Sequence, residues 1–122
     1  MDIDLNLGLA RHLGMRFLET TPERVVAEIE IREDVCTLGG SIHGGTLMAL
    51  ADTVGAVGTL MSGAKTATAE SKTNFFAAAK TGKVRAEATP LHKGKRTHVW
   101  QTRVTDESGR LLSLTIQTQM IL

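Results

Sequence analysis

The chain has 122 residues, of which 42% are hydrophobic, and this size predicts one hydrophobic core and a single domain over residues 1–122. Fourteen basic residues against thirteen acidic ones give a formal charge of +1, so no overall field favours a nucleic-acid partner. Cys36 is the only cysteine, which excludes an internal disulfide and fits a reducing compartment.

The N-terminal residues lack a basic region followed by a small-residue cleavage site, so they do not read as a signal peptide. No apolar run reaches the roughly 18 residues that span a bilayer. We therefore expect a cytoplasmic protein with no membrane partner.

The first third of the chain predicts a helix followed by two strands. Leucines at near-helical spacing favour a short helix over residues 4–12, with Gly14 as its stop. Residues 15–19 and 24–31 alternate in polarity around a Thr-Pro-Glu turn, which is typical of paired strands. Residues 33–41 contain a Gly-Gly pair and no sustained period, and we expect a loop there.

Residues 44–61 predict a helix that is apolar on nearly every side, and Gly63 follows it as a stop. Such a helix must be wrapped by other structure. Gly55 and Gly58 each cost about 1 kcal/mol relative to alanine inside a helix, so we expect a neighbouring backbone to approach closely there.

Four further strands are expected over residues 65–78, 83–91, 96–105 and 111–121. The short connections between them favour antiparallel neighbours, and we expect these last four strands to form a meander. The sequence thus predicts an α+β fold in which a curved antiparallel sheet of about six strands wraps one central helix.

Asp52 is the most informative residue of this helix, because an unpaired carboxylate among apolar side chains costs several kcal/mol. It needs a partner, a wet cleft or a raised pKa, any of which suits a general base or nucleophile. A structural aspartate that caps a neighbouring segment is the alternative.

The start of the same helix, after His43, presents free backbone N–H groups and the positive end of the helix dipole. Gly44 would let a carbonyl oxygen approach these donors, although a Gly-Gly pair before a helix is often only a turn. Gly44 and Asp52 are eight residues apart, about 12 Å along a helix, which is too far to serve one carbonyl group. If both act in catalysis, they belong to different copies in a two-fold dimer.

These residues resemble a known family. The ordered combination of His43-Gly44-Gly45 and Leu50-Ala51-Asp52 with later motifs is similar to hotdog-fold acyl-CoA thioesterases of the phenylacetate-pathway and 4-hydroxybenzoyl-CoA type, over roughly residues 8–122. The later motifs are Thr68, Asn74-Phe75, Lys80-Thr81-Gly82, Ala86-Glu87-Ala88, His92-Lys93-Gly94-Lys95-Arg96 and Asp106-Glu107-Ser108-Gly109.

The resemblance implies roles for individual residues. The N–H of Gly44 would polarise the thioester carbonyl, Asp52 of the partner subunit would activate water or attack the carbonyl, and Thr68 would help to place the water. His43 would shape the helix start. Thr37 stands where relatives often carry an asparagine or glutamine that holds the thioester oxygen, so this contribution departs from the family pattern.

A dense basic cluster, taken alone, is more often a solvated hairpin turn. Beside the thioesterase resemblance it becomes the candidate site for the nucleotide and phosphates of coenzyme A, with possible additions from Lys80 and Lys83. Phe75 is a candidate for lining the acyl or pantetheine channel, and the other aromatic residues read as core or interface packing. His12 and His98 read as structural. The cluster consists of His92, Lys93, Gly94, Lys95, Arg96 and Thr97.

We expect no metal, since no second histidine or cysteine stands at ligand spacing from His43, and no organic cofactor, coenzyme A being part of the substrate. No Gly-x-Ser-x-Gly motif supports a serine hydrolase. The leading interpretation is a homodimeric, further tetramerising, hydrolase of aryl, aryl-acetyl or medium-chain acyl-CoA. A non-catalytic acyl-CoA-binding protein and a hydratase or dehydratase on the same fold are the alternatives.

Overall fold

The computed structural model describes residues 3–122. Its elements confirm the predicted order of helices and strands, with the first helix starting at Gly8 rather than residue 4, and with a short 3-10 turn in the loop before the long helix. The bounds are α1 Gly8–Leu13, β1 Arg16–Thr21, β2 Arg24–Glu30, η1 Glu33–Val35, α2 Gly44–Met61, β3 Thr66–Phe75, β4 Lys83–Lys93, β5 Thr97–Thr105 and β6 Leu111–Ile121.

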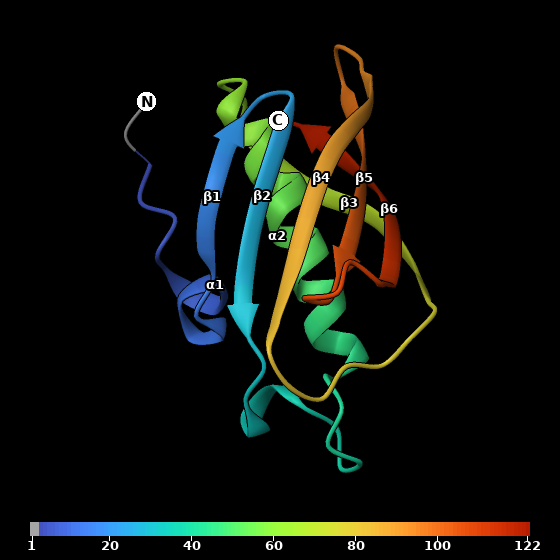
Figure 1. Ribbon diagram of the computed structural model, residues 1–122. Helices are drawn as coiled ribbons and strands as arrows, with labels where there is room; N and C mark the ends of the chain where they lie inside the picture. The colour runs from blue at the N-terminus through green and yellow to red at the C-terminus, as the bar shows by residue number, and fades with distance from the viewer. Residues whose placement is uncertain (1–2) are drawn as a thin grey trace.

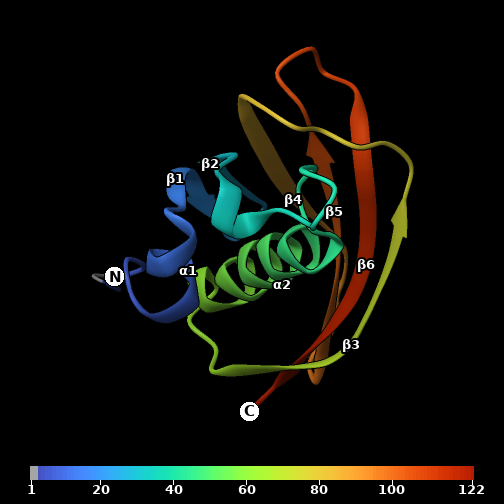
Figure 2. The same cartoon turned by 90° about the horizontal axis from the view of Figure 1, so that it is seen from below.

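The six strands form one antiparallel sheet in the order β1-β2-β4-β5-β6-β3, curved around α2 (Figures 1 and 2). This arrangement confirms the α+β hotdog fold. The predicted meander is confirmed for β4, β5 and β6 and is wrong for β3, because β3 pairs with β6 and the neighbour of β4 on its other side is β2. Residues 76–82 do not turn back on β3: the N–H of Phe76 bonds to Leu112, and the carbonyl of Ala79 accepts from Ile42 at 2.8 Å. These bonds lead the chain across the end of the sheet and leave β3 at its edge.

Helix α2 lies on the concave side of the sheet and forms the centre of the core (Figure 2). Leu50 and Val54 are fully buried against Trp100 and the small residues of β4. With 18 residues and a mean hydropathy of 1.2, α2 is long and apolar enough to span a membrane, contrary to the expectation that no segment is. Half of it is buried inside the domain, which identifies it as a core helix.

The two glycines inside α2 are explained by side chains and not by the backbone contact that we expected. A Cβ on Gly55 would lie 2.4 Å from the Oε1 atom of Gln117, and one on Gly58 would lie 2.3 Å from the indole ring of Trp100. Both side chains come from the sheet and are fully buried. The two glycines therefore make room for the side chains of Trp100 on β5 and Gln117 on β6. No close approach of a neighbouring backbone is required to explain them.

Strand β6 turns its polar side chains inward. Ser113, Thr115, Gln117 and Gln119 are fully buried, whereas Met120 is exposed and the apolar residues between them are only partly covered. Alternation of side chains across a strand normally places the apolar set in the core. Here the inner face of β6 borders the middle of α2, where Gln117 bonds Asp52 and Gln119 bonds Thr68.

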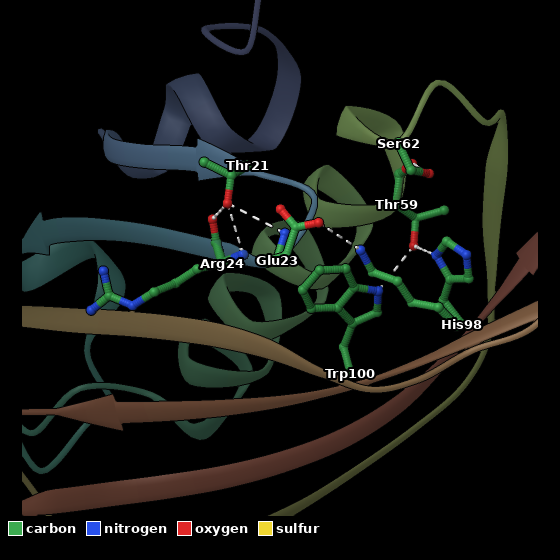
Figure 3. A network of polar contacts seen from close by, with 8 residues as sticks. Thr21, Glu23, Arg24, Thr59, Ser62, His98 and Trp100 are labelled. Carbon is green, nitrogen blue, oxygen red and sulfur yellow. Dashed lines mark hydrogen bonds and ion pairs between the residues drawn. The ribbon is translucent and has the colours of Figure 1, made fainter.

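A second buried polar group joins the end of α2 to β5 (Figure 3). The Oγ1 atom of Thr59 accepts a hydrogen bond from Trp100 Nε1 at 3.0 Å and lies 3.0 Å from Nδ1 of His98. With the indole N–H already donated, the threonine hydroxyl can give its own proton to the ring nitrogen of a neutral imidazole. The arrangement confirms a structural role for His98 and fixes the end of α2 against the sheet.

Protonation of His98 is expected to destabilise the fold. Its pKa lies below the ordinary 6.5, first because burial disfavours the imidazolium and then because Lys93 and His92 add positive charge nearby. The folded protein therefore binds fewer protons than the unfolded chain, so the stability is complete above about pH 6.5 and is lost as the pH falls through the lowered pKa. Melting temperatures measured between about pH 7.5 and 5.5 should fall in the wild type and change less in His98→Gln. The matched variant His12→Gln removes an exposed imidazole and should keep the wild-type slope; equal slopes in both variants would contradict the assignment.

Candidate active site

Asp52 lies in the middle of α2, where the helix faces β3 and β6, and it is partly buried. Its Oδ1 atom accepts a hydrogen bond from the hydroxyl of Thr68 on β3 at 2.5 Å and one from Nε2 of Gln117 on β6 at 3.2 Å. Gln117 also donates to the main-chain carbonyl of Asp52 at 3.3 Å. The structure thus brings together two residues that the sequence singled out and one that it did not.

A second glutamine of β6, Gln119, contacts Thr68. Gln119 donates from Nε2 to the Thr68 hydroxyl at 2.7 Å, and its Oε1 atom accepts from Thr66 at 2.9 Å. Sequence reasoning missed both glutamines, although the alternation of Thr115, Gln117 and Gln119 with apolar residues offered a signal. This alternation does not show which set of side chains points into the core, since either face of a strand can be the inner one.

The carboxylate of Asp52 borders a depression of about 320 Å³ with an apolar wall. Three apolar and three polar side chains line it, a combination that suits an acyl chain next to a reacting carboxylate. Its lining residues are Leu9, Met48, Ala49, Asp52, Thr68 and Ser71.

The start of α2 is built by His43, which occupies the N-cap position with extended backbone angles. Its Nδ1 atom accepts the N–H of Gly45 at 2.7 Å, which leaves the imidazole as a cap of the helix. Among residues 3–122, no acceptor bonds the N–H of Gly44, and the ring of the half-exposed Phe75 lies over this glycine, 3.2 Å from the position of a Cβ. A free donor beside an aromatic side chain suits the binding of a carbonyl oxygen.

Within one chain, these two groups of residues stay apart. Gly44 is the first residue of α2 and Asp52 comes more than two turns later, which corresponds to about 12 Å of helix rise. Gly44 touches β3 at Phe75, and Asp52 bonds β3 at Thr68. Edge strand β3 therefore borders both half-sites, one near each of its ends.

Thr37 lies in the loop before α2, where its hydroxyl accepts the N–H of Gly39 at 3.2 Å. It borders a different depression from that of Asp52, shared with Arg32, Cys36 and Lys80. No bond in the described residues joins Thr37 to Gly44, and its role as an oxyanion donor stays a prediction.

The basic residues 92–97 form the turn between β4 and β5, and Lys83 begins β4 at the other end of that strand. The turn lies at the end of the sheet near the last residues of α2, opposite the helix start (Figure 1). His98 ties it to Thr59 there. Residues 3–122 contain no cluster of three or more His, Cys, Asp or Glu side chains that could hold a metal ion.

A helix wrapped by a six-stranded antiparallel sheet, with a carboxylate at mid-helix and a free N–H at its start, defines the hotdog class of enzymes. Residues 39–113 match the family model described as Thioesterase superfamily. The chain belongs to this superfamily, and it is a thioester hydrolase.

Relatives and solved structures agree with this membership. The 1,4-dihydroxy-2-naphthoyl-CoA hydrolase of Escherichia coli is 36% identical over 90% of this chain and 83% of its own length. The putative esterase ComA2 of Bacillus subtilis is 32% identical over 92% of each chain. Among solved structures, that of AziG from S. sahachiroi has a TM-score of 0.91 and 27% identity, covering 95% of this chain and 97% of its own.

Proposed function

We propose that the protein hydrolyses an acyl-CoA thioester to a free acid and coenzyme A. The observation that carries the proposal is the Asp52 carboxylate, which is anchored through Oδ1 at the edge of an apolar depression. Relatives named as hydrolases of a CoA thioester add support. The depression accommodates an aryl, aryl-acetyl or medium aliphatic group.

In the proposed reaction, the N–H of Gly44 donates to the thioester oxygen and stabilises the charge that develops on it. Asp52 either takes a proton from a water molecule that attacks the carbonyl carbon, or attacks that carbon itself and is released by water. In both routes, the C–S bond breaks, and the thiolate of coenzyme A leaves with the electron pair and takes up a proton. In the first route, water supplies the second carboxyl oxygen of the product. In the second route, an oxygen of Asp52 forms an anhydride with the acyl group, and water opens it at the carboxyl carbon of Asp52, so this oxygen enters the product and water restores the carboxylate. His43 holds the helix start in place.

A homodimer would complete the site. Among the strands of residues 3–122, β3 pairs only with β6, and most of its ten residues are exposed, so it offers an open sheet edge to a second copy. Antiparallel pairing of two β3 strands about a two-fold axis brings the Thr68 end of one copy beside the Phe75 end of the other. Gly44 then comes close to Asp52 of the partner subunit, and each dimer has two equivalent sites.

The basic turn formed by residues 92–97 is the proposed site for the phosphates of coenzyme A. Gly94 makes a tight turn in which its N–H bonds the carbonyl of Thr97 at 2.8 Å, and Lys95 and Arg96 are exposed beside it. Exposed lysine and arginine side chains at a tight turn suit phosphate groups.

A panel of acyl-CoA substrates tests the proposed activity and its acyl preference. We expect thiol release from benzoyl-, phenylacetyl- and medium-chain acyl-CoA at rates that differ by at least about tenfold between acyl groups, since pocket contacts separate such substrates by 1–3 kcal/mol. The same preparations should show no hydration of an enoyl-CoA, measured by loss of the enoyl absorbance. Hydration without thiol release would replace the proposal with the hydratase alternative.

A further inference from the structure

We propose that Gln119 is a positioning residue of the active site, which acts through Thr68 to fix the orientation of the Asp52 carboxylate. This inference rests on the proposed catalytic role of Asp52. It concerns a side chain that is fully buried, lies on β6 and makes no bond to Asp52 itself.

The directions of the two hydrogen bonds made by the Thr68 hydroxyl follow from simple chemistry. An ionised carboxylate can only accept, so the single proton of the Thr68 hydroxyl must point to Asp52, 2.5 Å away. Because that proton is used, the atom of Gln119 that lies 2.7 Å from the hydroxyl oxygen must be a donor, which identifies it as the amide nitrogen. The amide oxygen then faces the hydroxyl of Thr66 at 2.9 Å, and the single proton of this hydroxyl is shared between the amide oxygen and the main-chain carbonyl of Met120 at 2.8 Å.

The amide of Gln119 thereby leaves the Thr68 hydroxyl with one orientation. Without the amide donor, its proton could rotate away from the carboxylate toward a water molecule or a substrate atom. Gln117 adds a second donor to the same oxygen, Oδ1. Among residues 3–122, no protein group donates to Oδ2, so the structure commits one carboxylate oxygen to the protein and leaves the other for chemistry.

The substitution Gln119→Met tests this inference, because methionine has a similar length and neither donates nor accepts the two bonds. We expect kcat for the fastest acyl-CoA of the panel to fall about tenfold, the worth of one buried hydrogen bond, with KM changed less than about twofold. The matched control is Gln101→Met, which makes the same change on the outward face of β5 opposite Ile116 and should keep the wild-type kcat.

A double-mutant cycle with Thr68→Val separates positioning from mere structural support. If Gln119 acts through the Thr68 hydroxyl, Gln119→Met causes no further loss of kcat once that hydroxyl is absent. A loss that multiplies in the double variant, or a wild-type kcat in Gln119→Met, would overturn the inference. Melting temperatures of all variants show which of them fold, and the comparison is made below the lowest of these.

The outcome also distinguishes this inference from the proposed function. Normal hydrolysis by Asp52→Asn would remove the proposed role of Asp52 itself. An inactive Asp52→Asn together with a fully active Gln119→Met would leave that role intact and reject only the positioning by Gln119.

Discussion

The Asp52→Asn variant is expected to lose about a thousandfold of its acyl-CoA turnover while keeping its fold, as for removal of a general base or nucleophile. The amide can place its oxygen where Oδ1 stands and still accept from Thr68 and Gln117, so the surrounding bonds survive. It cannot take a proton from water or form an acyl bond to the substrate carbon. The loss should therefore appear in kcat, with binding of coenzyme A unchanged.

Thiol-release kinetics and calorimetric binding of coenzyme A check both halves of this expectation. Asp34→Asn makes the same chemical change on an exposed residue of η1 whose carboxylate pairs with Arg32 and makes no bond to Asp52, Thr68 or Gln117, and it serves as the control. Turnover of Asp52→Asn within about tenfold of the wild type would refute the assignment, because that is less than general-base catalysis contributes. A single turnover of the wild type in oxygen-18 water separates the two roles of the acid: label in the product after one turnover indicates direct attack by water, and label first in Asp52 indicates an acyl intermediate.

The central helix and the presence of six strands were readable from the sequence because each depends on local periodicity. The near-uniform apolar pattern of residues 44–61 leaves no alternative to a wrapped helix, and α2 has these bounds. The order of the strands in the sheet could not be predicted in the same way, since it depends on contacts between residues far apart in the sequence. The bonds of Phe76 to Leu112 and of Ile42 to Ala79 decide where β3 lies, and no local pattern encodes them.

The same distinction between local patterns and distant contacts decides which residues of the candidate site could be predicted. Asp52 stands out because a carboxylate is costly in an apolar helix, and a cost of that kind is visible from composition alone. The two glutamines of β6 carry no such cost in a strand of unknown facing, so only the three-dimensional structure shows that they support Asp52. Gly55 gives a partial clue: a glycine inside a helix predicts a close approach, but it does not predict that the approaching group is the side chain of Gln117.

Replacing Gly44 by proline is expected to lower kcat by about a hundredfold or more, the usual loss when one oxyanion donor is removed. Gly44 is the first residue of α2, a position where proline is tolerated, and His43 before it has φ −67° and ψ 137°, extended angles that a following proline accepts. The substitution therefore removes the free N–H without breaking the helix. Gly44→Ala is the matched control, because its Cβ meets the same Phe75 ring at 3.2 Å while its N–H remains.

Mixing Gly44→Pro with Asp52→Asn tests whether two chains share each site. In a two-fold dimer with shared sites, a mixed dimer places both lesions in one site and leaves the other intact, so random mixing of equal amounts restores about a quarter of the wild-type activity. Refolding the two inactive variants together, or expressing them together with different tags, provides the mixed dimers. Activity no higher than that of the parents would show that each site is built within one chain. Restored activity would show that Gly44 and Asp52 of one site come from two chains, as the proposed pairing of the open β3 edges requires.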